Sequence, residues 1–120
     1  MIKRKSDMRH DPKEALRGGD GVTVFDHIME KTELLGNCRI FCKATLEPGA
    51  SIGYHQHDQE EEVYYILSGV ATVNDNGQEV VLHPGDAHSA GNGGSHSIAN
   101  HGEGLLEFLA VILTYQAPER

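Results

Sequence analysis

Residues 49–69 read GASIGYHQHDQEEEVYYILSG, and this stretch decides how the chain is interpreted. His55 and His57 are separated by one residue. On a β-strand, side chains spaced in this way point to the same face, with their Cα atoms about 6.6 Å apart. Two imidazoles so placed can bind one ion, and the run Glu60-Glu61-Glu62 adds a carboxylate a few residues later. The stretch therefore predicts the beginning of a metal site.

A third histidine, His96, lies in a glycine-rich stretch at residues 85–100, which reads GDAHSAGNGGSHSIAN. Three neutral imidazole nitrogens and one carboxylate oxygen form a mixed ligand set that suits Mn²⁺, Fe²⁺, Ni²⁺ or Zn²⁺. Four protein ligands leave two positions open on an octahedral ion. This favours catalysis or chelation of a substrate over a closed structural site.

The rest of the chain consists mainly of short strand-forming runs broken by turn residues. Strands are expected at residues 22–28, 38–46, 62–67, 70–73, 78–82, 95–99 and 105–113. This pattern predicts an all-β sandwich or barrel rather than a βαβ fold. One short helix is also expected near the N-terminus, because Asp11 can cap it, Pro12 suits its first turn and Gly18-Gly19 can end it.

The two glycine- and histidine-containing stretches resemble the sequence motifs of the cupin family. The first has the pattern G-x5-H-x-H-x4-E-x6-G from Gly49 to Gly69, and the second has G-x5-G-x-G-x2-H-x3-N from Gly85 to Asn100. The resemblance implies an all-β double-stranded β-helix, or jelly-roll barrel. It also implies a single domain over residues 1–120, with a core at about 37–114 and an N-terminal extension over 1–36.

The cupin register implies four metal ligands, namely His55, His57, Glu62 and His96. It selects Glu62 over Glu60 and Glu61, which are interpreted as solvated carboxylates at the entry of a strand. The resemblance further implies that Mn²⁺ is favoured, followed by Fe²⁺, Ni²⁺ or Zn²⁺. It also implies a homodimer, with the strand at residues 22–28 as a candidate contact. Gly91 stands where the family usually has proline, so the loop at residues 91–94 is expected to be mobile.

Within the family, the chain resembles small bacterial and thermophile cupins described as predicted oxalate decarboxylases. This implies a metal-dependent enzyme, either a lyase or an isomerase, that acts on a small chelating carboxylate or sugar acid, with His88 or Tyr64 as candidate catalytic residues that move a proton. An Fe²⁺-dependent dioxygenase and a non-catalytic module that binds or senses a small metabolite are the alternatives. Two features count against oxalate: Arg39 is expected to point away from the cavity, and the chain has no obvious acidic lid.

Other polar residues have structural interpretations. Tyr64 also fits core packing, and His88 also fits an alternative ligand or a surface histidine. Asn100 is expected in a turn, and histidines without convergent partners are expected on the surface: His10, His27, His83 and His101. Cys38 and Cys42, about 13 Å apart on one strand, are too distant for a disulfide and are expected to be buried.

Composition narrows the classes of partner. The formal net charge is −8, from 18 acidic against 10 basic residues, which argues against nucleic-acid binding. No apolar run approaches the roughly 20 residues that cross a bilayer, and the basic residues 1–5 lead into polar sequence rather than a signal segment. A cytoplasmic protein with a small-molecule ligand is expected.

Overall fold

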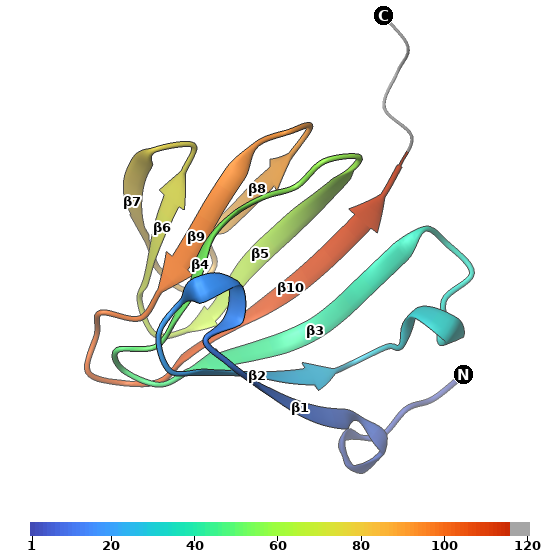
Figure 1. Ribbon diagram of the computed structural model, residues 1–120. Helices are drawn as coiled ribbons and strands as arrows, with labels where there is room; N and C mark the ends of the chain where they lie inside the picture. The colour runs from blue at the N-terminus through green and yellow to red at the C-terminus, as the bar shows by residue number, and fades with distance from the viewer. Residues whose placement is uncertain (116–120) are drawn as a thin grey trace, which may run out of the picture.

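The computed structural model describes residues 1–115, which form two antiparallel β-sheets packed face to face (Figure 1). The larger sheet has six strands in the order β1 (Arg9–Glu14), β2 (Val22–His27), β3 (Cys38–Leu46), β10 (Leu106–Thr114), β5 (Glu60–Ser68) and β8 (Ala87–Gly91). The smaller sheet has four, in the order β4 (Ser51–Gln56), β9 (Ser95–Ala99), β6 (Ala71–Asp75) and β7 (Gln78–Leu82). The predicted all-β jelly roll is confirmed.

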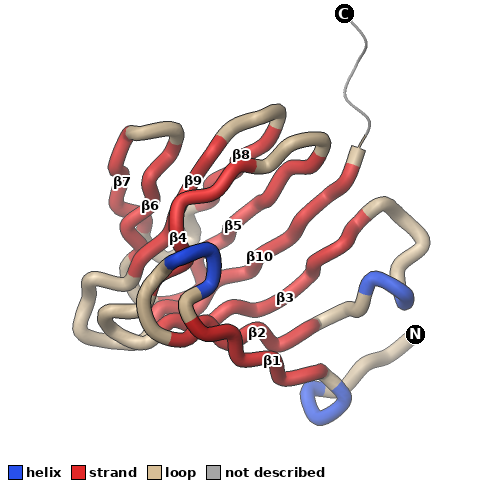
Figure 2. The backbone as a smooth tube through the Cα atoms, in the orientation of Figure 1, coloured by secondary structure: helices blue, strands red, loops and turns tan. Residues whose placement is uncertain are grey.

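Helical structure among residues 1–115 is limited to three short 3-10 segments, η1 (Lys5–Asp7), η2 (Leu16–Gly18) and η3 (Lys31–Glu33), drawn in blue in Figure 2. None of the described helical segments is long and apolar enough to cross a membrane.

The expected N-terminal helix is wrong, because residues 9–14 form strand β1. This strand pairs with β2 along its whole length, from Arg9 opposite His27 to Glu14 opposite Val22. The Asp11 carboxylate is hydrogen-bonded to Nε2 of His27 at 3.1 Å and does not cap a helix. Pro12 is compatible with β1 because the strand lies at the edge of the sheet, where a missing backbone donor is tolerated.

Strand β2 lies between β1 and β3, so both of its edges are hydrogen-bonded within the sheet. A dimer contact through this strand, as the resemblance implied, would therefore have to use its outward face.

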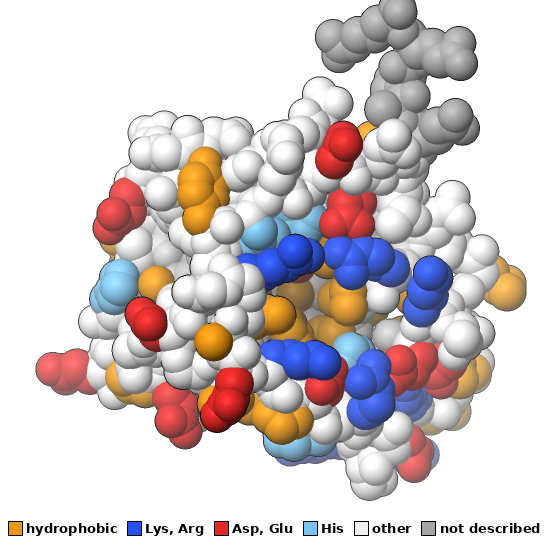
Figure 3. Space-filling model, in the orientation of Figure 1, with side chains coloured by type: hydrophobic (Ala, Val, Ile, Leu, Met, Phe, Trp, Pro, Cys, Tyr) orange, Lys and Arg blue, Asp and Glu red, His pale blue; other side chains and the backbone are white. Residues whose placement is uncertain are grey.

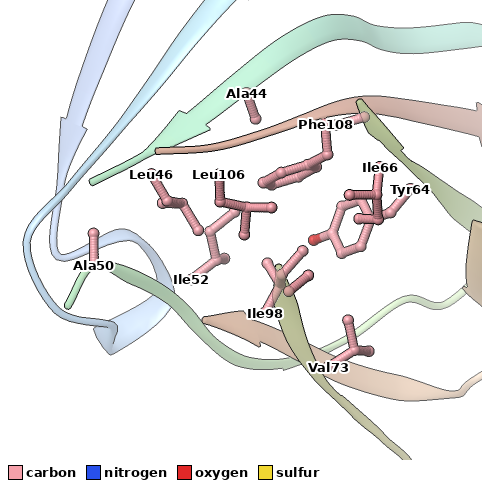
Figure 4. Close-up of a cluster of buried hydrophobic side chains, with 12 residues drawn as sticks. Ala44, Leu46, Ala50, Ile52, Tyr64, Ile66, Val73, Ile98, Leu106 and Phe108 are labelled. Atoms are coloured by element: carbon pink, nitrogen blue, oxygen red, sulfur yellow. The ribbon is translucent and has the colours of Figure 1, made fainter. Parts of the chain in front are cut away.

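The hydrophobic core fills the space between the two sheets (Figure 4). In β10 every second side chain faces it, and in β5 Tyr64 and Ile66 do so. The smaller sheet contributes Ile52, Val73 and Ile98, all at most 4% exposed. Each fully buried aliphatic or aromatic side chain stabilises the fold by about 1.5–3 kcal/mol. The core occupies one end of the sandwich and leaves the other end to polar residues.

Candidate metal centre

Four predicted ligand residues converge at the polar end of the sandwich: His55 from β4, His57 just after β4, Glu62 from β5 and His96 from β9. One donor atom from each lies within 4.8 Å of the others. The His57 and His96 Nε2 atoms are 3.0 Å apart, and the His96 and His55 Nε2 atoms are 3.2 Å apart. Glu62 Oε1 lies 3.0 Å from His96 Nε2 and 3.2 Å from His57 Nε2. The structure thus brings the predicted set together.

Backbone pairing positions two of these histidines. His55 and His96 face each other in the β4–β9 register. His57 lies beyond the end of β4, and its backbone is bonded to the glycine loop instead: its N–H donates to Gly94 O, and Gly93 N–H donates to its carbonyl, both at 2.9 Å. The loop at residues 91–94, expected to be mobile, is therefore tied directly to a ligand residue.

Gly91 itself has a packing reason to be glycine. A Cβ at this position would lie 2.5 Å from the Cβ of Glu61 on the adjacent strand β5. The departure from the usual proline thus reflects the close approach of β8 to β5.

The second nitrogen of each imidazole has its own partner. The Nδ1 of His55 donates to the Gly53 carbonyl at 2.6 Å, and the Nδ1 of His57 donates to Glu60 Oε1 at 2.7 Å. The Nδ1 of His96 lies 3.0 Å from Nε2 of His88. Such partners fix the ring orientation and the tautomer of metal-binding histidines. With Nδ1 protonated in His55 and His57, both Nε2 lone pairs are directed at the shared centre.

This geometry fits a cation. Lone pairs of neutral imidazoles 3.0–3.2 Å apart repel one another unless a positive charge lies between them. With metal–ligand bonds of about 2.1 Å, donors at right angles lie about 3.0 Å apart, and tetrahedral donors lie about 3.4 Å apart. The short separations agree with right angles, and the 3.8 Å from His55 Nε2 to Glu62 Oε1 agrees with more opposed positions.

The electrostatics favour an ionised carboxylate at the centre. Burial alone would raise the pKa of Glu62, but its interactions with the three imidazoles hold that pKa well below its usual value. The pKa of His57 is raised, chiefly by its hydrogen bond to Glu62. Burial lowers the pKa values of His96 and His88, which favours their neutral forms. A negative oxygen and neutral nitrogens are the forms that bind metal.

Glu60 was interpreted as a solvated carboxylate, and that is wrong. It accepts hydrogen bonds from Arg39 Nε at 2.7 Å and Arg39 Nη2 at 2.9 Å, and from His57. The Arg39 guanidinium, the largest influence, lowers the pKa of Glu60 to about 2. The position of Glu60, three residues after His57, was the available signal for this contact.

Arg39 was expected to point away from the cavity, and it lines the cavity instead. Along β10, Ile112 pairs with Ile40 and Leu113 pairs with Cys38, so Arg39 is an extra residue in β3. Such a β-bulge re-aims a side chain that simple alternation would place on the other face. Because the bulge directs Arg39 toward the cavity, the expected absence of a cation there no longer counts against an anionic ligand.

A cavity of about 180 Å³ is lined by three of the four donor residues, His55, His57 and Glu62. Lys and Arg side chains gather around a hollow on this face of the molecule, and apolar and histidine side chains are visible within it (Figure 3). Three cations line the cavity: Lys13, Arg17 and Arg39. Lys13 and Arg17 were missed as site residues because they lie in the segment predicted to be a helix, outside both motifs.

The two candidate catalytic residues lie close to the centre. Tyr64 is 1% exposed, lines the cavity and stacks on His96 with ring centroids 4.8 Å apart. Its hydroxyl is buried without a hydrogen-bond partner among residues 1–115. Burial, with the nearby Glu62 charge, raises the pKa of Tyr64 well above its ordinary value. His88 is directed at His96, so its position fits support of that ring.

Of the four histidines predicted on the surface, His10, His83 and His101 are exposed as expected, and His27 is not. His27 is buried between Asp11, 3.1 Å from its Nε2, and Cys42, whose sulfur is 3.2 Å from its Nδ1. Burial raises the pKa of Cys42 to about 12, so the thiol is unreactive at neutral pH. Cys38 is also free and buried, as expected. Asn100 is buried at the turn after β9, where its amide donates to the Leu46 carbonyl at 2.9 Å.

Comparisons with known proteins agree with this architecture. The cupin domain model matches residues 42–112. An oxalate-binding protein of Thermotoga maritima is 40% identical over 113 residues, which cover 94% of this chain and 93% of that protein. The crystal structure of a predicted oxalate decarboxylase from Thermotoga maritima is similar with a TM-score of 0.90 and 39% identity, covering 95% of this chain and 99% of that one.

A more distant similarity concerns the fold alone. The structure of a polyketide cyclase from Streptomyces resistomycificus has a TM-score of 0.73 at 20% identity, over 99% of this chain and 89% of that one. Since the domain match covers more than half of the residues and a relative at 40% identity spans nearly all of them, this chain belongs to the cupin family.

Proposed function

We propose that this cupin binds one divalent transition metal through His55, His57, Glu62 and His96 and uses it to hold a small chelating carboxylate such as oxalate. The observation that carries the proposal is the convergence of three imidazole nitrogens and a carboxylate oxygen beside a cavity whose lining includes three cations. The mixed nitrogen and oxygen set suits Mn²⁺, Fe²⁺, Ni²⁺ or Zn²⁺. Among these, the resemblance to small cupins favours Mn²⁺.

Two observations support a carboxylate as the ligand. A relative covering 94% of the chain is an oxalate-binding protein. The cavity also contains the positive charge that recognition of a dianion requires, since Arg39 and Arg17 both line it. A bound divalent ion with two free positions would supply Lewis-acid attraction for two ligand oxygens.

The contribution of the chain's own residues is to bind and orient the ligand. Tyr64 lines the cavity and its buried hydroxyl has an unused donor, which we propose donates to a ligand oxygen. Its raised pKa keeps this proton in place at neutral pH. Glu60 and His88 hold the rings of His57 and His96 in the orientation that directs Nε2 to the centre.

The first test is elemental analysis of the natively purified protein and a His57→Ala variant. We expect near-stoichiometric metal in the wild type and strongly reduced metal in the variant, because one donor is lost. A matched control is His101→Ala, which removes an exposed histidine and leaves metal content unchanged. Equal metal in wild type and His57→Ala would overturn the proposed site.

A metal-dependent decarboxylase is the second candidate, favoured by the similarity to a predicted oxalate decarboxylase. Release of CO₂ from oxalate by the Mn²⁺-loaded protein would support it. Tight oxalate binding without CO₂ release leaves binding as the function. Fe²⁺ in protein purified without oxygen, with O₂ consumption on ligand addition, would instead indicate a dioxygenase.

We also propose a homodimer formed through the outer face of the six-stranded sheet. This face carries exposed apolar side chains on β5 and β10, including Tyr65 at 43%, Leu67 at 41% and Leu113 at 39% exposure. Light scattering coupled to gel filtration should give twice the 13.1 kDa chain mass. Tyr65→Glu should shift the protein toward the monomer, and a monomeric wild type would contradict the proposal.

A further inference from the structure

The N-terminal segment forms one wall of the metal-site cavity, although it lies outside the region that matches the cupin domain. Lys13, Leu16 and Arg17 line the same cavity as the ligand residues His55 and His57. The metal donors and this wall therefore come from separate parts of the chain.

Close backbone packing holds this wall in place. A Cβ on Gly53 would lie 2.0 Å from the Arg17 carbonyl oxygen, and a Cβ on Gly19 would lie 2.2 Å from the Ser51 carbonyl oxygen. Two glycines thus let the turn at η2 rest directly on β4, the strand that carries His55. The Ser51 N–H also donates to the Asp20 carbonyl at 2.8 Å.

Arg17 adopts a backbone conformation that is costly for its residue type. Its φ of 55° and ψ of 29° are left-handed, and Ala15 before it is also left-handed, with φ of 46°. Residues with a Cβ rarely adopt this conformation, because the Cβ comes too close to the following carbonyl oxygen. Backbone strain of this kind persists where the surrounding structure holds the residue in place. Here the packing of η2 on β4 holds Arg17 at the mouth of the cavity.

The cations that line the cavity differ in their partners. Arg39 is held by both oxygens of Glu60, and Lys13 lies 3.6 Å from Asp11. The Asp11 carboxylate is further paired with Arg9 at 3.2 Å. Arg17 makes no ion pair or side-chain hydrogen bond with residues 1–115, so its charge is available to a ligand.

A second polar group in the same cavity also lacks a partner. The Tyr64 hydroxyl is buried and unpaired among the described residues. A buried donor without an acceptor is destabilising, and a bound anion that accepts its hydrogen bond would remove this cost. An arginine at the mouth and a hydroxyl in the interior therefore both lack an anionic acceptor.

We infer that Arg17 is a specificity-determining residue that pairs with the ligand's outward-facing carboxylate oxygens and selects dianions over monoanions of the same shape. The inference rests on the proposed function. A guanidinium donates two parallel hydrogen bonds to a carboxylate, whereas it finds no second acceptor oxygen and no second charge on an amide. The N-terminal segment thus determines which chelating ligand is retained.

Isothermal titration calorimetry on the Mn²⁺-loaded full chain tests this with oxalate and with oxamate, in which an amide replaces one carboxylate. Arg17→Asn removes the charge, and asparagine tolerates the left-handed backbone. We expect the variant to bind oxalate at least about 10-fold more weakly and oxamate within about 2-fold of wild type. Metal content should be unchanged, and Arg17→Lys should restore part of the oxalate affinity.

The matched control is Arg4→Gln, which removes one exposed cation that does not line this cavity and should leave both affinities unchanged. Equal loss for oxalate and oxamate in Arg17→Asn, or no loss for either, overturns the role of Arg17 while wild-type oxalate binding still supports the proposed function. A metal-loaded wild type that does not bind oxalate overturns both.

Discussion

At the scale of single residues, Glu60 supports the metal centre without being a predicted donor. It accepts a hydrogen bond from Nδ1 of His57 and two hydrogen bonds from Arg39, so it fixes the orientation of one ligand ring. Outer partners of this kind typically change metal affinity by 10- to 100-fold.

Glu60→Gln should therefore weaken Mn²⁺ binding by about 10-fold or more, because an amide is a poorer acceptor for the His57 proton. Competition with a chelator of known affinity measures this. Glu61→Gln is the matched control, since this neighbouring carboxylate makes no ion pair among residues 1–115. Equal metal affinity in both variants would show that Glu60 has no role in orienting His57.

Glu60 should also make the stability of the metal-free protein depend on pH. Its folded-state pKa of about 2 lies below the usual value of 4.5, so its contribution is fully present above about pH 4.5. That contribution is lost as the pH falls toward 2. In thermal melts, wild type minus Glu60→Gln should show a Tm difference at pH 6 that shrinks by pH 3. A difference independent of pH would contradict the assignment.

Tyr64→Phe separates folding from ligand binding. Removing a buried, unpaired hydroxyl should leave the metal-free protein equally stable or about 1 kcal/mol more stable, because a desolvated donor is lost. Oxalate affinity should fall in the same variant, because the ligand loses a hydrogen bond. A Tyr64→Phe protein that is less stable would show that the hydroxyl already has a partner.

At the scale of elements, the close contact between η2 and β4 holds one wall of the cavity in place. Gly19→Ala places a Cβ 2.2 Å from the Ser51 carbonyl oxygen, so the turn must move off the strand. We expect a loss of about 1–3 kcal/mol in stability and weaker oxalate binding, with metal content retained. Gly36→Ala is the control, because nothing lies within 4 Å of its added Cβ.

The elements that could be predicted from the sequence are those with strong alternation. The strand at residues 38–46 was predicted with its observed bounds, and β10 was predicted to within one residue at each end. Residues 9–14 were mistaken for a helix because Asp11 and Pro12 satisfy local capping rules, while the pairing of β1 with β2 depends on residues 22–27. Local propensity does not report on such non-local partners.

The four donors of the site could be predicted from the sequence, but the residues around them could not. The four donors follow from motif spacing, which records the strand geometry of the family. The orientation of Arg39 could not be predicted, because a bulge in β3 reverses the alternation on which the prediction relied. The contribution of Arg17 depends on the packing of glycines 19 and 53, two positions far apart in the chain.

At the scale of the whole molecule, charge is unevenly distributed. The chain has a net charge of −8, whereas the cavity lining contains three cations, Lys13, Arg17 and Arg39, and two carboxylates, Asp11 and Glu62. A dianion approaching the protein is therefore repelled by most of the surface and attracted at the mouth.

Salt should weaken oxalate binding, because the attraction at the partly exposed mouth is screened. Between about 20 mM and 500 mM KCl we expect a several-fold rise in the Kd for oxalate in calorimetric titrations of Mn²⁺-loaded protein. The dependence should be smaller in Arg17→Asn, which has one charge fewer at the mouth. An affinity independent of ionic strength would contradict a role for the rim charges.

The direct seating of η2 on β4 also has an evolutionary consequence. Because the turn rests on the donor strand through glycine contacts, its sequence can diverge without altering the donor atoms. Metal chemistry and ligand choice can then be inherited separately. Replacing residues 1–21 with the corresponding segment of another small cupin should transfer that protein's ligand preference and leave metal binding unchanged.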